Sequence, residues 1–377
     1  MKTTNPFRVL AVLCCSIALT GCPAAKNGGA GGNAGNGSSK PSGASGTSTK
    51  KPVFSLAWSE YPSWSVFGVA HTKKLINGAE GQLSTLEMKW GVDIVLKQLT
   101  YDACITQYGA GQADAVCITN MDILSPSLGR ASVAICPTST SAGADACIVM
   151  GDIDLQALKE QKIPVYGLDK SVSEYCFVRY LEEKGEKESD YKFTSKGPDE
   201  AALAMQANPD STKAIMVWNP FVMQTLRKVK GSKRLFDSKE IPEEIIDMLV
   251  MSKDSLAKPG GKKFACAIID TFYQVTSMIE GSTARKETLL ALAAKFAPEL
   301  TVEDMEIVVE ETAFYKTPDA GIALYNSDKF QKDTMKRVLT FCASHGMVEK
   351  EPTIVYGEGD AQLRFDTSFM QMVKDKK

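Results

Sequence analysis

The side chains of this sequence best suited to bind a small molecule stand where the predicted β-strands end. They combine aromatic rings, hydroxyl and amide groups and carboxylates, namely Trp58, Ser59, Glu60, Tyr61 and Trp64 after the first strand, Tyr101 after the second, Asn120, Met121 and Asp122 after the third, Ser139 and Ser141 after the fourth, Ser171, Ser173, Glu174 and Tyr175 at a helix start, and Trp218 and Asn219 after a later strand. Ligands of open α/β sheets bind beyond the carboxyl ends of the strands, and helix starts there offer free N–H groups. We therefore expect these residues to line one ligand-binding cleft, with the aromatic rings as its walls.

The charges of these residues predict the charge of the ligand. Glu60, Asp122 and Glu174 would bring three carboxylates to the cleft, and no Lys or Arg stands at the same strand ends. Because unpaired carboxylates are costly in a dry site, a planar cation such as guanidinium, which can pair with a carboxylate through two hydrogen bonds, is a suitable ligand. An aromatic face over such a cation would add ~0.5–2 kcal/mol.

Several of the polar residues also have a purely structural interpretation. Ser171 and Glu174 have the spacing of a capping box, which closes a helix start without a ligand. Asn219 precedes Pro220 as an N-cap residue precedes a proline at the first helical position, and Asp122 could cap its own helix. The repeated placement of tryptophan and tyrosine beside strand ends favours the binding interpretation for the group as a whole.

The elements that must position these residues alternate between strand and helix. Strand patterns occur at 53–58, 92–99, 115–119, 132–137, 144–150, 163–167, 191–194 and 214–218, and helical patterns separate most of them. This alternation is typical of parallel βαβ units. After a last strand near 247–251, helical segments follow one another with little strand between them. The order predicts an α/β protein of two lobes joined by two crossings, in which residues 52–140 and 252–377 form lobe 1 and residues 141–251 form lobe 2.

The N-terminal residues predict export and attachment to a lipid. A basic start and an apolar run over 9–19 have the layout of a secretory signal peptide, and that run is too short to span the ~30 Å core of a bilayer. It ends in Leu-Thr-Gly-Cys, which resembles a bacterial lipobox, so 1–21 is the expected signal peptide and Cys22 the expected lipidated residue. The alternative is an ordinary signal peptide with a chance cysteine. The lipidated cysteine and a flexible Gly/Ser-rich linker would then occupy 22–51.

The composition excludes several classes of partner. Residues 51–377 carry 38 Lys and Arg against 45 Asp and Glu, and this acidic balance argues against nucleic acid or an acidic membrane surface as a partner. Beyond Cys22 the chain has seven cysteines, mostly in apolar runs, at Cys104, Cys117, Cys136, Cys147, Cys176, Cys266 and Cys342. Buried free thiols are expected, although a disulfide such as Cys136–Cys147 is an alternative in an exported protein. No zinc-ligand spacing occurs, and neither a metal site nor a cofactor is expected.

The order of several short motifs along the chain resembles a known family. The segments 54–59, 101–115, 141–146 and 171–173 resemble the substrate-binding lipoproteins of ABC importers in the nitrate, sulfonate, taurine and thiamine-precursor group. The segments 119–122, 218–220, 314–318 and 363–366 are most similar to the subgroup associated with urea carboxylase, which is connected with urea or guanidine uptake. The resemblance covers about residues 52–372, nearly the whole folded part.

The resemblance implies a type II periplasmic-binding-protein fold and a protein that is not an enzyme. Such a protein would be exported, lipid-anchored and monomeric, facing the periplasm or the cell exterior. It would capture a small nitrogenous solute, guanidine- or urea-like and cationic, and deliver it to the permease and ATPase subunits of an importer. One departure is Glu174, where relatives are expected to carry histidine or a neutral residue, and it favours a positive charge on the ligand.

Three other functions stay open at this stage. The ligand could be taurine, another sulfonate, nitrate or a thiamine-precursor pyrimidine. The protein could be a sensor that presents its ligand to a receptor. An enzyme like the pyrimidine synthases of this fold is the third alternative, but their cysteine-rich motif is missing, and His71 and His345 stand in helical segments without a nucleophile pattern around them.

Overall fold

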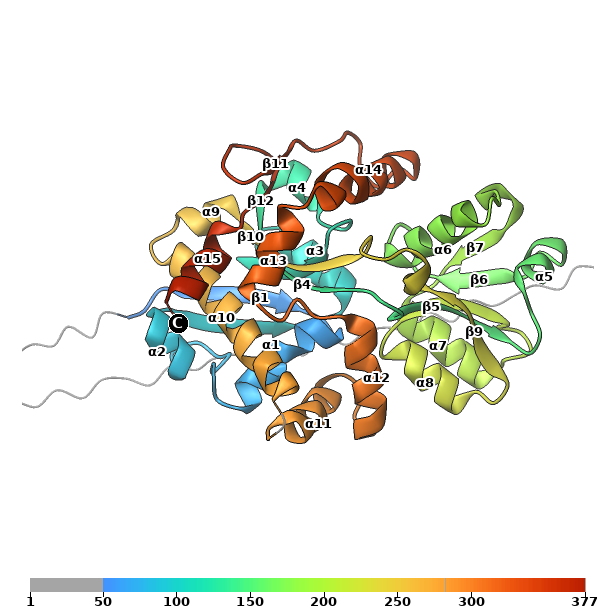
Figure 1. The fold of residues 1–377 in the computed structure, drawn as a ribbon, viewed down its shortest axis with the longest axis horizontal. Coiled ribbons are helices and arrows are strands. Elements are labelled where there is room, and N and C mark those ends of the chain that lie inside the picture. Colours follow the sequence, from blue (N-terminus) through green and yellow to red (C-terminus); the bar gives the residue numbers. More distant parts are fainter. Residues whose placement is uncertain (1–49, 282, 377) are drawn as a thin grey trace, which may run out of the picture. The chain divides into compact units, whose positions relative to one another are not determined.

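The computed structural model describes residues 50–281 and 283–376, and Figure 1 shows their fold. The predicted signal peptide, the lipidated Cys22 and the linker up to residue 49 lie outside the described residues. In the described part the strands are β1 (Val53–Trp58), β2 (Asp93–Gln98), β3 (Ala115–Thr119), β4 (Ser132–Thr140), β5 (Asp145–Met150), β6 (Pro164–Gly167), β7 (Lys192–Ser195), β8 (Ala214–Trp218), β9 (Ser232–Asp237), β10 (Ile246–Ser252), β11 (Ile354–Tyr356) and β12 (Leu363–Phe365).

Helices connect and cover these strands. They are α1 (Pro62–Thr72), α2 (Thr85–Trp90), α3 (Tyr101–Gly109), α4 (Leu124–Gly129), α5 (Leu155–Glu160), α6 (Val172–Glu183), α7 (Pro198–Ala207), α8 (Phe221–Lys228), α9 (Lys253–Ala257), α10 (Gly261–Glu280), α11 (Arg285–Phe296), α12 (Val302–Thr312), α13 (Pro318–Tyr325), α14 (Met335–Ser344) and α15 (Ser368–Asp375). Short helical turns η1 (Glu188–Asp190), η2 (Ser238–Glu240) and η3 (Lys329–Thr334) complete the set.

The strands form two separate sheets, each the centre of one lobe. The sheet of lobe 1 has the order β11-β12-β4-β10-β3-β1-β2, and the sheet of lobe 2 has the order β7-β6-β8-β5-β9. Most neighbours are parallel, but β10 runs antiparallel to β3 and β4. In lobe 2, β5 runs antiparallel to β8 and β9. Each sheet therefore contains one central strand that begins where its neighbours end.

The chain crosses between the lobes twice, and the second crossing lies earlier than the sequence analysis placed it. The first crossing connects β4 to β5, close to the predicted boundary after residue 140. The boundary predicted at 251 is wrong, because β10 already pairs with β3 and β4 of lobe 1. The second crossing therefore runs through about residues 238–245. The position of β10 depends on pairing with distant strands, which a local apolar run does not reveal.

The period-two alternation of strand side chains divides the core of lobe 2 between its two faces. In β5, Ala146 and Ile148 belong to the hydrophobic cluster formed with α7 and α8. Cys147 and Val149 belong to the larger cluster, which includes buried residues of α6. In Figure 1, α6 accordingly lies on one side of this sheet and α7 and α8 on the other. Strands buried on both faces explain the continuous apolar runs of the sequence.

In lobe 1 the long helix α10 is the central packing element. It packs against α1, α2, α11, α15 and β4, and its residues from Phe264 to Phe272 are buried without interruption. Within the described residues, no helix is both long enough and apolar enough to cross a bilayer. All seven cysteines of this part are buried free thiols. This confirms the prediction of buried free thiols, and the alternative disulfide Cys136–Cys147 is not formed.

Candidate functional site

A small cavity lies between the two lobes at the ends of their central strands. Its lining comes from lobe 1, lobe 2 and the second crossing, and consists of Tyr61, Trp64, Tyr101, Thr119, Asp145, Val172, Trp218, Ile245 and Asp247. No Lys, Arg or His lines it. Its volume is about 20 Å³, which is room for about one water molecule. A larger ligand can therefore enter only if the lobes separate first.

Two aspartates stand in this cavity because of the antiparallel strands. Asp145 begins β5 and pairs in register with Trp218 at the end of β8. Asp247 lies at the start of β10, in register with Thr119 at the end of β3 and with Ser139 of β4. The start of an antiparallel strand thus meets the carboxyl ends of its neighbours, where ligands of such sheets bind. Each sheet contributes one carboxylate in this way.

Neither aspartate has a positively charged partner. Both are 2% exposed, and no ion pair joins either of them to the described residues. Asp145 Oδ1 is buried without a hydrogen-bond partner. Asp247 Oδ2 accepts a hydrogen bond from Ser139 Oγ at 2.5 Å, and that hydroxyl lies 2.9 Å from Ser63 Oγ. Buried carboxylates without a cation are costly, so the two groups together form a site that lacks a counter-ion.

The pKa values of these carboxyl groups reflect the missing cation. Burial raises the pKa of Asp145 to about 7. A hydrogen bond with Ser141 partly lowers this pKa, and repulsion from Asp122 raises it further. Burial also raises the pKa of Asp247 well above its ordinary value, and repulsion from Asp145 adds to this rise. The phenol of Tyr61 is affected in the same direction, because burial and the two aspartates raise its pKa. A cation in the cavity would reverse this balance by stabilising the ionised carboxylates.

Aromatic rings form the rest of the wall. Trp64 stacks on Tyr101 with ring centroids 5.3 Å apart, and Tyr61 lies 5.0 Å from Trp64. Trp218 of lobe 2 meets the edge of Tyr101 of lobe 1 at 6.0 Å. The indole Nε1 of Trp64 is buried without a hydrogen-bond partner, whereas the hydroxyl of Tyr61 interacts with Asp247 and lowers the pKa of that carboxyl group. The cavity thus combines two carboxylates without a cationic partner, one unpartnered indole N–H and aromatic faces that attract cations.

Among the three carboxylates named from the sequence, Asp122 lies directly behind the cavity. Its Oδ2 accepts hydrogen bonds from Tyr101 Oη at 2.6 Å and Thr119 Oγ1 at 2.8 Å. Burial raises the pKa of Asp122 to about 6, although both hydroxyl groups lower it. Asp122 therefore holds the Tyr101 ring in place against the cavity and does not line the cavity itself.

Glu60 and Glu174 lie elsewhere, so the three predicted carboxylates do not converge. Glu60 lines a larger outer pocket. Glu174 accepts a hydrogen bond from Lys170 N at 2.6 Å, close to its expected role in closing the start of α6. Glu174, Glu188 and His345 also place one ligand atom each within 4.8 Å of one another, a metal-ligand spacing that the sequence did not predict.

Several predicted polar residues make contacts that join the protein together. Asn120 donates to Glu244 O and accepts from Ile246 N, which fixes the second crossing to β3. Asn219 Nδ2 donates to Glu311 Oε2 at 3.0 Å and so connects lobe 2 to α12 of lobe 1. The remaining predicted residues outside the cavity lining are also mostly buried, namely Trp58, Ser59, Met121, Ser139, Ser141, Ser171, Ser173 and Tyr175.

The two aspartates of the cavity were not among the residues predicted from the sequence. Asp145 belongs to the segment 141–146 that carries the family resemblance, and Asp247 belongs to the predicted strand near 247–251. The sequence feature that could have identified them is a single acidic residue at the start of each of two strands that are otherwise apolar and buried. A charge in such a run is rarely buried without a partner or a function.

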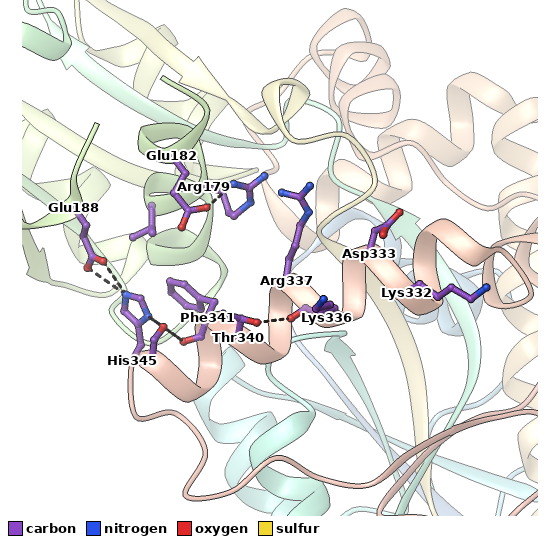
Figure 2. A pocket seen from close by; sticks show the side chains of 12 residues that line it. Arg179, Glu182, Glu188, Lys332, Asp333, Lys336, Arg337, Thr340, Phe341 and His345 are labelled. Carbon is purple, nitrogen blue, oxygen red and sulfur yellow. Dashed lines mark hydrogen bonds and ion pairs between the residues drawn. The ribbon is translucent and has the colours of Figure 1, made fainter. Parts of the chain in front are cut away.

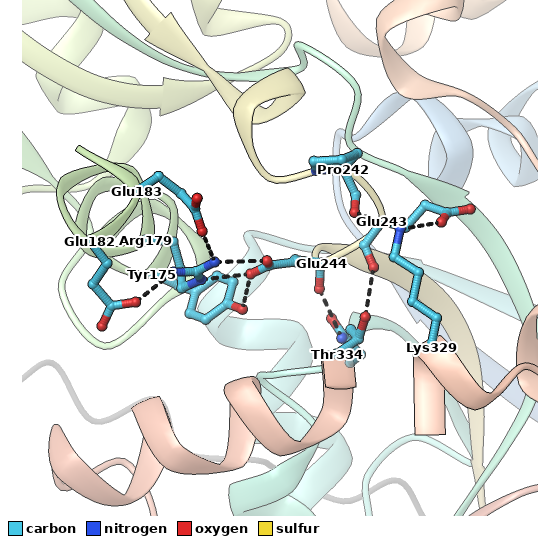
Figure 3. Close-up of polar contacts among 10 residues, drawn as sticks. Tyr175, Arg179, Glu182, Glu183, Pro242, Glu243, Glu244, Lys329 and Thr334 are labelled. Carbon is cyan, nitrogen blue, oxygen red and sulfur yellow. Dashed lines mark hydrogen bonds and ion pairs between the residues drawn. The ribbon is translucent and has the colours of Figure 1, made fainter. Parts of the chain in front are cut away.

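The second crossing is tied to both lobes by a polar network that Figure 3 shows. Arg179 of α6 donates from Nε to Glu244 Oε2 at 2.8 Å, and the hydroxyl of Tyr175 donates to the same oxygen at 2.6 Å. On the side of lobe 1, Lys329 pairs with the carboxylate of Glu243 at 2.7 Å. The second crossing therefore has polar contacts with each lobe.

A second and larger cavity lies between α6 and α14 (Figure 2) and has a volume of about 700 Å³. Arg179 there pairs with Glu182 and Glu183 as well as with Glu244. His345 Nε2 lies 3.1 Å from the Glu188 carboxylate. Arg179 and His345 thus have carboxylate partners, whereas Lys336 and Arg337 line the same cavity without an ion pair to the described residues.

Comparison with known proteins supports the fold. No family model and no curated protein sequence matches the chain. Among solved structures, the periplasmic aliphatic sulphonate binding protein SsuA of Escherichia coli is similar at 15% identity and a TM-score of 0.63, covering 80% of this chain and 94% of that one. The alkanesulfonate-binding protein of Xanthomonas axonopodis pv. citri, bound to MOPS, is similar at 13% identity and a TM-score of 0.63, covering 80% and 96%.

A ligand-binding component of an ABC-type import system from Staphylococcus aureus, solved with zinc bound, is similar at 12% identity and a TM-score of 0.58, covering 79% of this chain and 93% of that one. Together with the order of the two sheets, these similarities show that the chain has the type II periplasmic-binding-protein fold, two lobes joined by two crossings. The fold expected from the sequence is thereby confirmed.

Proposed function

We propose that this protein is an extracytoplasmic substrate-binding protein of an ABC importer and that its ligand is a small nitrogenous cation of the guanidine type. The fold supports the binding role, because two lobes around a central cavity can close on a solute. The subgroup resemblance in the sequence supports a guanidine- or urea-like solute. The protein would capture this solute and release it to a permease without making or breaking a bond.

The observation that carries the ligand charge is the unpaired state of Asp145 and Asp247. A planar guanidinium could donate paired hydrogen bonds to a carboxylate from each lobe, and the stacked Trp64 and Tyr101 offer aromatic faces to it. Because Asp145 belongs to lobe 2 and Asp247 to lobe 1, one cation between them would favour the closed arrangement. The ligand would thus stabilise closure by its own charge.

Polar contacts on another side of the cavity support opening and closing of the lobes. Arg234 of β9 pairs with Glu311 of α12 at 2.5 Å, beside the bond from Asn219 to the same carboxylate. Lys228 of α8 lies 3.3 Å from Glu299. These contacts join lobe 2 to helices of lobe 1, so they would separate when the cavity opens. The exposed pair of Lys228 with Glu299 is worth only ~0–1 kcal/mol, whereas Glu311 is 4% exposed, so its contacts with Arg234 and Asn219 would hold the lobes closed more strongly.

Calorimetry of the purified protein tests the proposal. Guanidinium, methylguanidine, urea, taurine, an alkanesulfonate and an aminopyrimidine are titrated at constant ionic strength. We expect guanidinium compounds to bind with micromolar affinity, about −8 kcal/mol, and Asp247→Asn to abolish the binding. Asp210→Asn, an exposed aspartate without a described partner, is the control of equal charge change. Binding of none of the cations would refute the proposed ligand class.

An anionic ligand is the second candidate. Two of the similar structures are sulfonate-binding proteins, and the unpartnered Nε1 of Trp64 could donate a hydrogen bond to an anion. Asp145 and Asp247 could also act as donors if both stayed protonated. Stabilisation by sulfonates in the same titrations, without stabilisation by cations, would favour this candidate.

The cellular context is also part of the proposal. We propose that the protein is exported, carries a lipid on Cys22 and works as a monomer with permease and ATPase subunits. Incorporation of a labelled fatty acid that is lost in Cys22→Ala would support the anchor. Uptake of labelled guanidine that depends on this protein would separate an importer component from a sensor, and size-exclusion chromatography with light scattering would test the monomer.

A further inference from the structure

An outer pocket adjoins the central cavity and extends its chemistry. It has a volume of about 380 Å³, and its lining includes Glu60, Tyr101, Asp102, Asp199, Glu200 and Trp218. The lining includes four carboxylates and no Lys, Arg or His. None of these four carboxylates has an ion pair with the described residues. The outer pocket is therefore a second place where negative charge gathers without a counter-ion.

The two spaces share a wall. Tyr101 and Trp218 line both the central cavity and the outer pocket, and both rings are nearly buried, at 6% exposure each. Their ring centroids are 6.0 Å apart in an edge-on contact. Because Tyr101 belongs to lobe 1 and Trp218 to lobe 2, separation of the lobes would part the two rings and join the spaces. A slender chain could then lie between the rings when the lobes close.

The outer carboxylates also come from both lobes. Glu60 precedes α1 of lobe 1, whereas Asp199 lies in the first turn of α7 in lobe 2. Burial raises the pKa of Glu60, and the charge of Asp199 adds to the rise. Closure thus brings like charges together, and a cation between them would remove this cost. The arrangement repeats the relation between Asp145 and Asp247 in the central cavity, where Asp145 Oδ1 is buried without a partner.

We propose that the site takes a linear dication, with one cationic head between Asp145 and Asp247, an alkyl stem between Tyr101 and Trp218, and a second cationic group in the outer pocket. This inference rests on the proposed function, since it requires a cation in the central cavity. It adds that a single guanidinium fills only the inner half of the site. An aminoalkylguanidine has the required chemistry, and a diaminoalkane is the simpler member of the same class.

Two ligands that differ only in the second charge provide the test. Butylguanidine and 4-aminobutylguanidine are titrated by calorimetry into the full mature chain at low ionic strength. We expect the dication to bind at least about tenfold more tightly, because its ammonium group gains attraction from unpaired carboxylates. The advantage is expected to shrink as salt rises, since the outer pocket is open to screening.

Variants in the outer pocket separate this inference from the proposed function. Glu60→Gln with Asp199→Asn is expected to remove the advantage of the dication and to change the affinity for butylguanidine by less than about twofold, because the central carboxylates are retained. Asp210→Asn with Glu358→Gln, exposed carboxylates without described partners, is the control of equal charge change.

Equal affinity for the two ligands in the unsubstituted protein would overturn the dication inference and leave the proposed function standing. An equal loss of affinity for both ligands in the Glu60→Gln, Asp199→Asn variant would overturn it as well, because the outer pocket would then not bind the second cationic group specifically. If guanidinium, butylguanidine and the dication all fail to bind, the proposed function fails together with the inference.

Discussion

The substitution Asp145→Asn should make the empty protein more stable while it removes ligand binding. Burial raises the pKa of Asp145 from 3.8 to about 7, a shift of roughly three units. At ~1.4 kcal/mol per unit, the ionised carboxylate lowers the free energy of unfolding by up to about 4 kcal/mol. Asparagine has nearly the same shape and no charge, so it would remove this cost.

The sign of the effect determines its pH dependence. Between its unfolded pKa near 3.8 and its folded pKa near 7, the folded state retains a proton on Asp145 that the unfolded state has lost. The free energy of unfolding of the empty protein therefore falls as the pH rises through this window, and the loss is complete above about pH 7. Asp145→Asn should match the unsubstituted protein near pH 4 and exceed it near pH 8.

Thermal unfolding followed by circular dichroism at the two pH values measures this difference. For a folded part of this length, ~4 kcal/mol corresponds to a rise in Tm of roughly 6 °C at about pH 8. Asp114→Asn is the matched control of opposite sign, because hydrogen bonds from Lys258 and Ser255 help to lower the pKa of Asp114. A variant Asp145→Asn that is no more stable than the unsubstituted protein at pH 8, or equally shifted at pH 4, would refute this reasoning.

Three further predictions concern binding and the second crossing. The affinity for guanidinium should fall by at least about tenfold per pH unit below pH 7, because a proton on Asp145 competes with the cation and a second proton on Asp247 would make the fall steeper; calorimetry over that range would show it, and an affinity independent of pH would contradict it. Trp218→Leu should weaken guanidinium binding by ~0.5–2 kcal/mol through loss of an aromatic face, and unchanged binding in the same titration would count against the aromatic wall. Arg179→Met should lower the free energy of unfolding by ~3–5 kcal/mol, because the carboxylate of Glu244 is left buried without its partner; urea unfolding measures this, and a loss below about 1 kcal/mol would contradict it.

Much of the local structure follows from the sequence, because local rules determine it. The strands at 53–58 and 115–119 have the predicted bounds. In each case the element is apolar or regularly patterned and is bordered by residues that end it. Two lobes followed from the alternation of strand and helix and from the run of helices near the end of the chain.

The membership of β10 could not be obtained in the same way. Its apolar residues fit either sheet, and only its pairing with β3 and β4 assigns it to lobe 1. The antiparallel direction of β5 and β10 is also the reason why the two central carboxylates were not predicted from the sequence. The rule for parallel strands selects residues after strand ends, whereas Asp145 and Asp247 stand at strand starts.

The aromatic part of the site was easier to predict than its charged part. Tyr61, Trp64, Tyr101 and Trp218 were named from the sequence, and the structure places all four around the central cavity. A large aromatic ring beside a strand end can be buried in few places other than the wall of such a cavity. Carboxylates also cap helices, pair with surface charges or hold other side chains, as Asp122 holds Tyr101, and these roles depend on contacts far apart in sequence.

The central claim is that Asp145 and Asp247 hold a cation between the lobes. A crystal structure of the protein grown with guanidinium tests this claim most directly. We predict planar density in the central cavity, with nitrogen atoms about 2.7–2.9 Å from both carboxylates and next to the rings of Trp64 and Tyr101. Guanidinium found elsewhere, or a cavity occupied by an anion with both carboxyl groups turned away, would contradict the account.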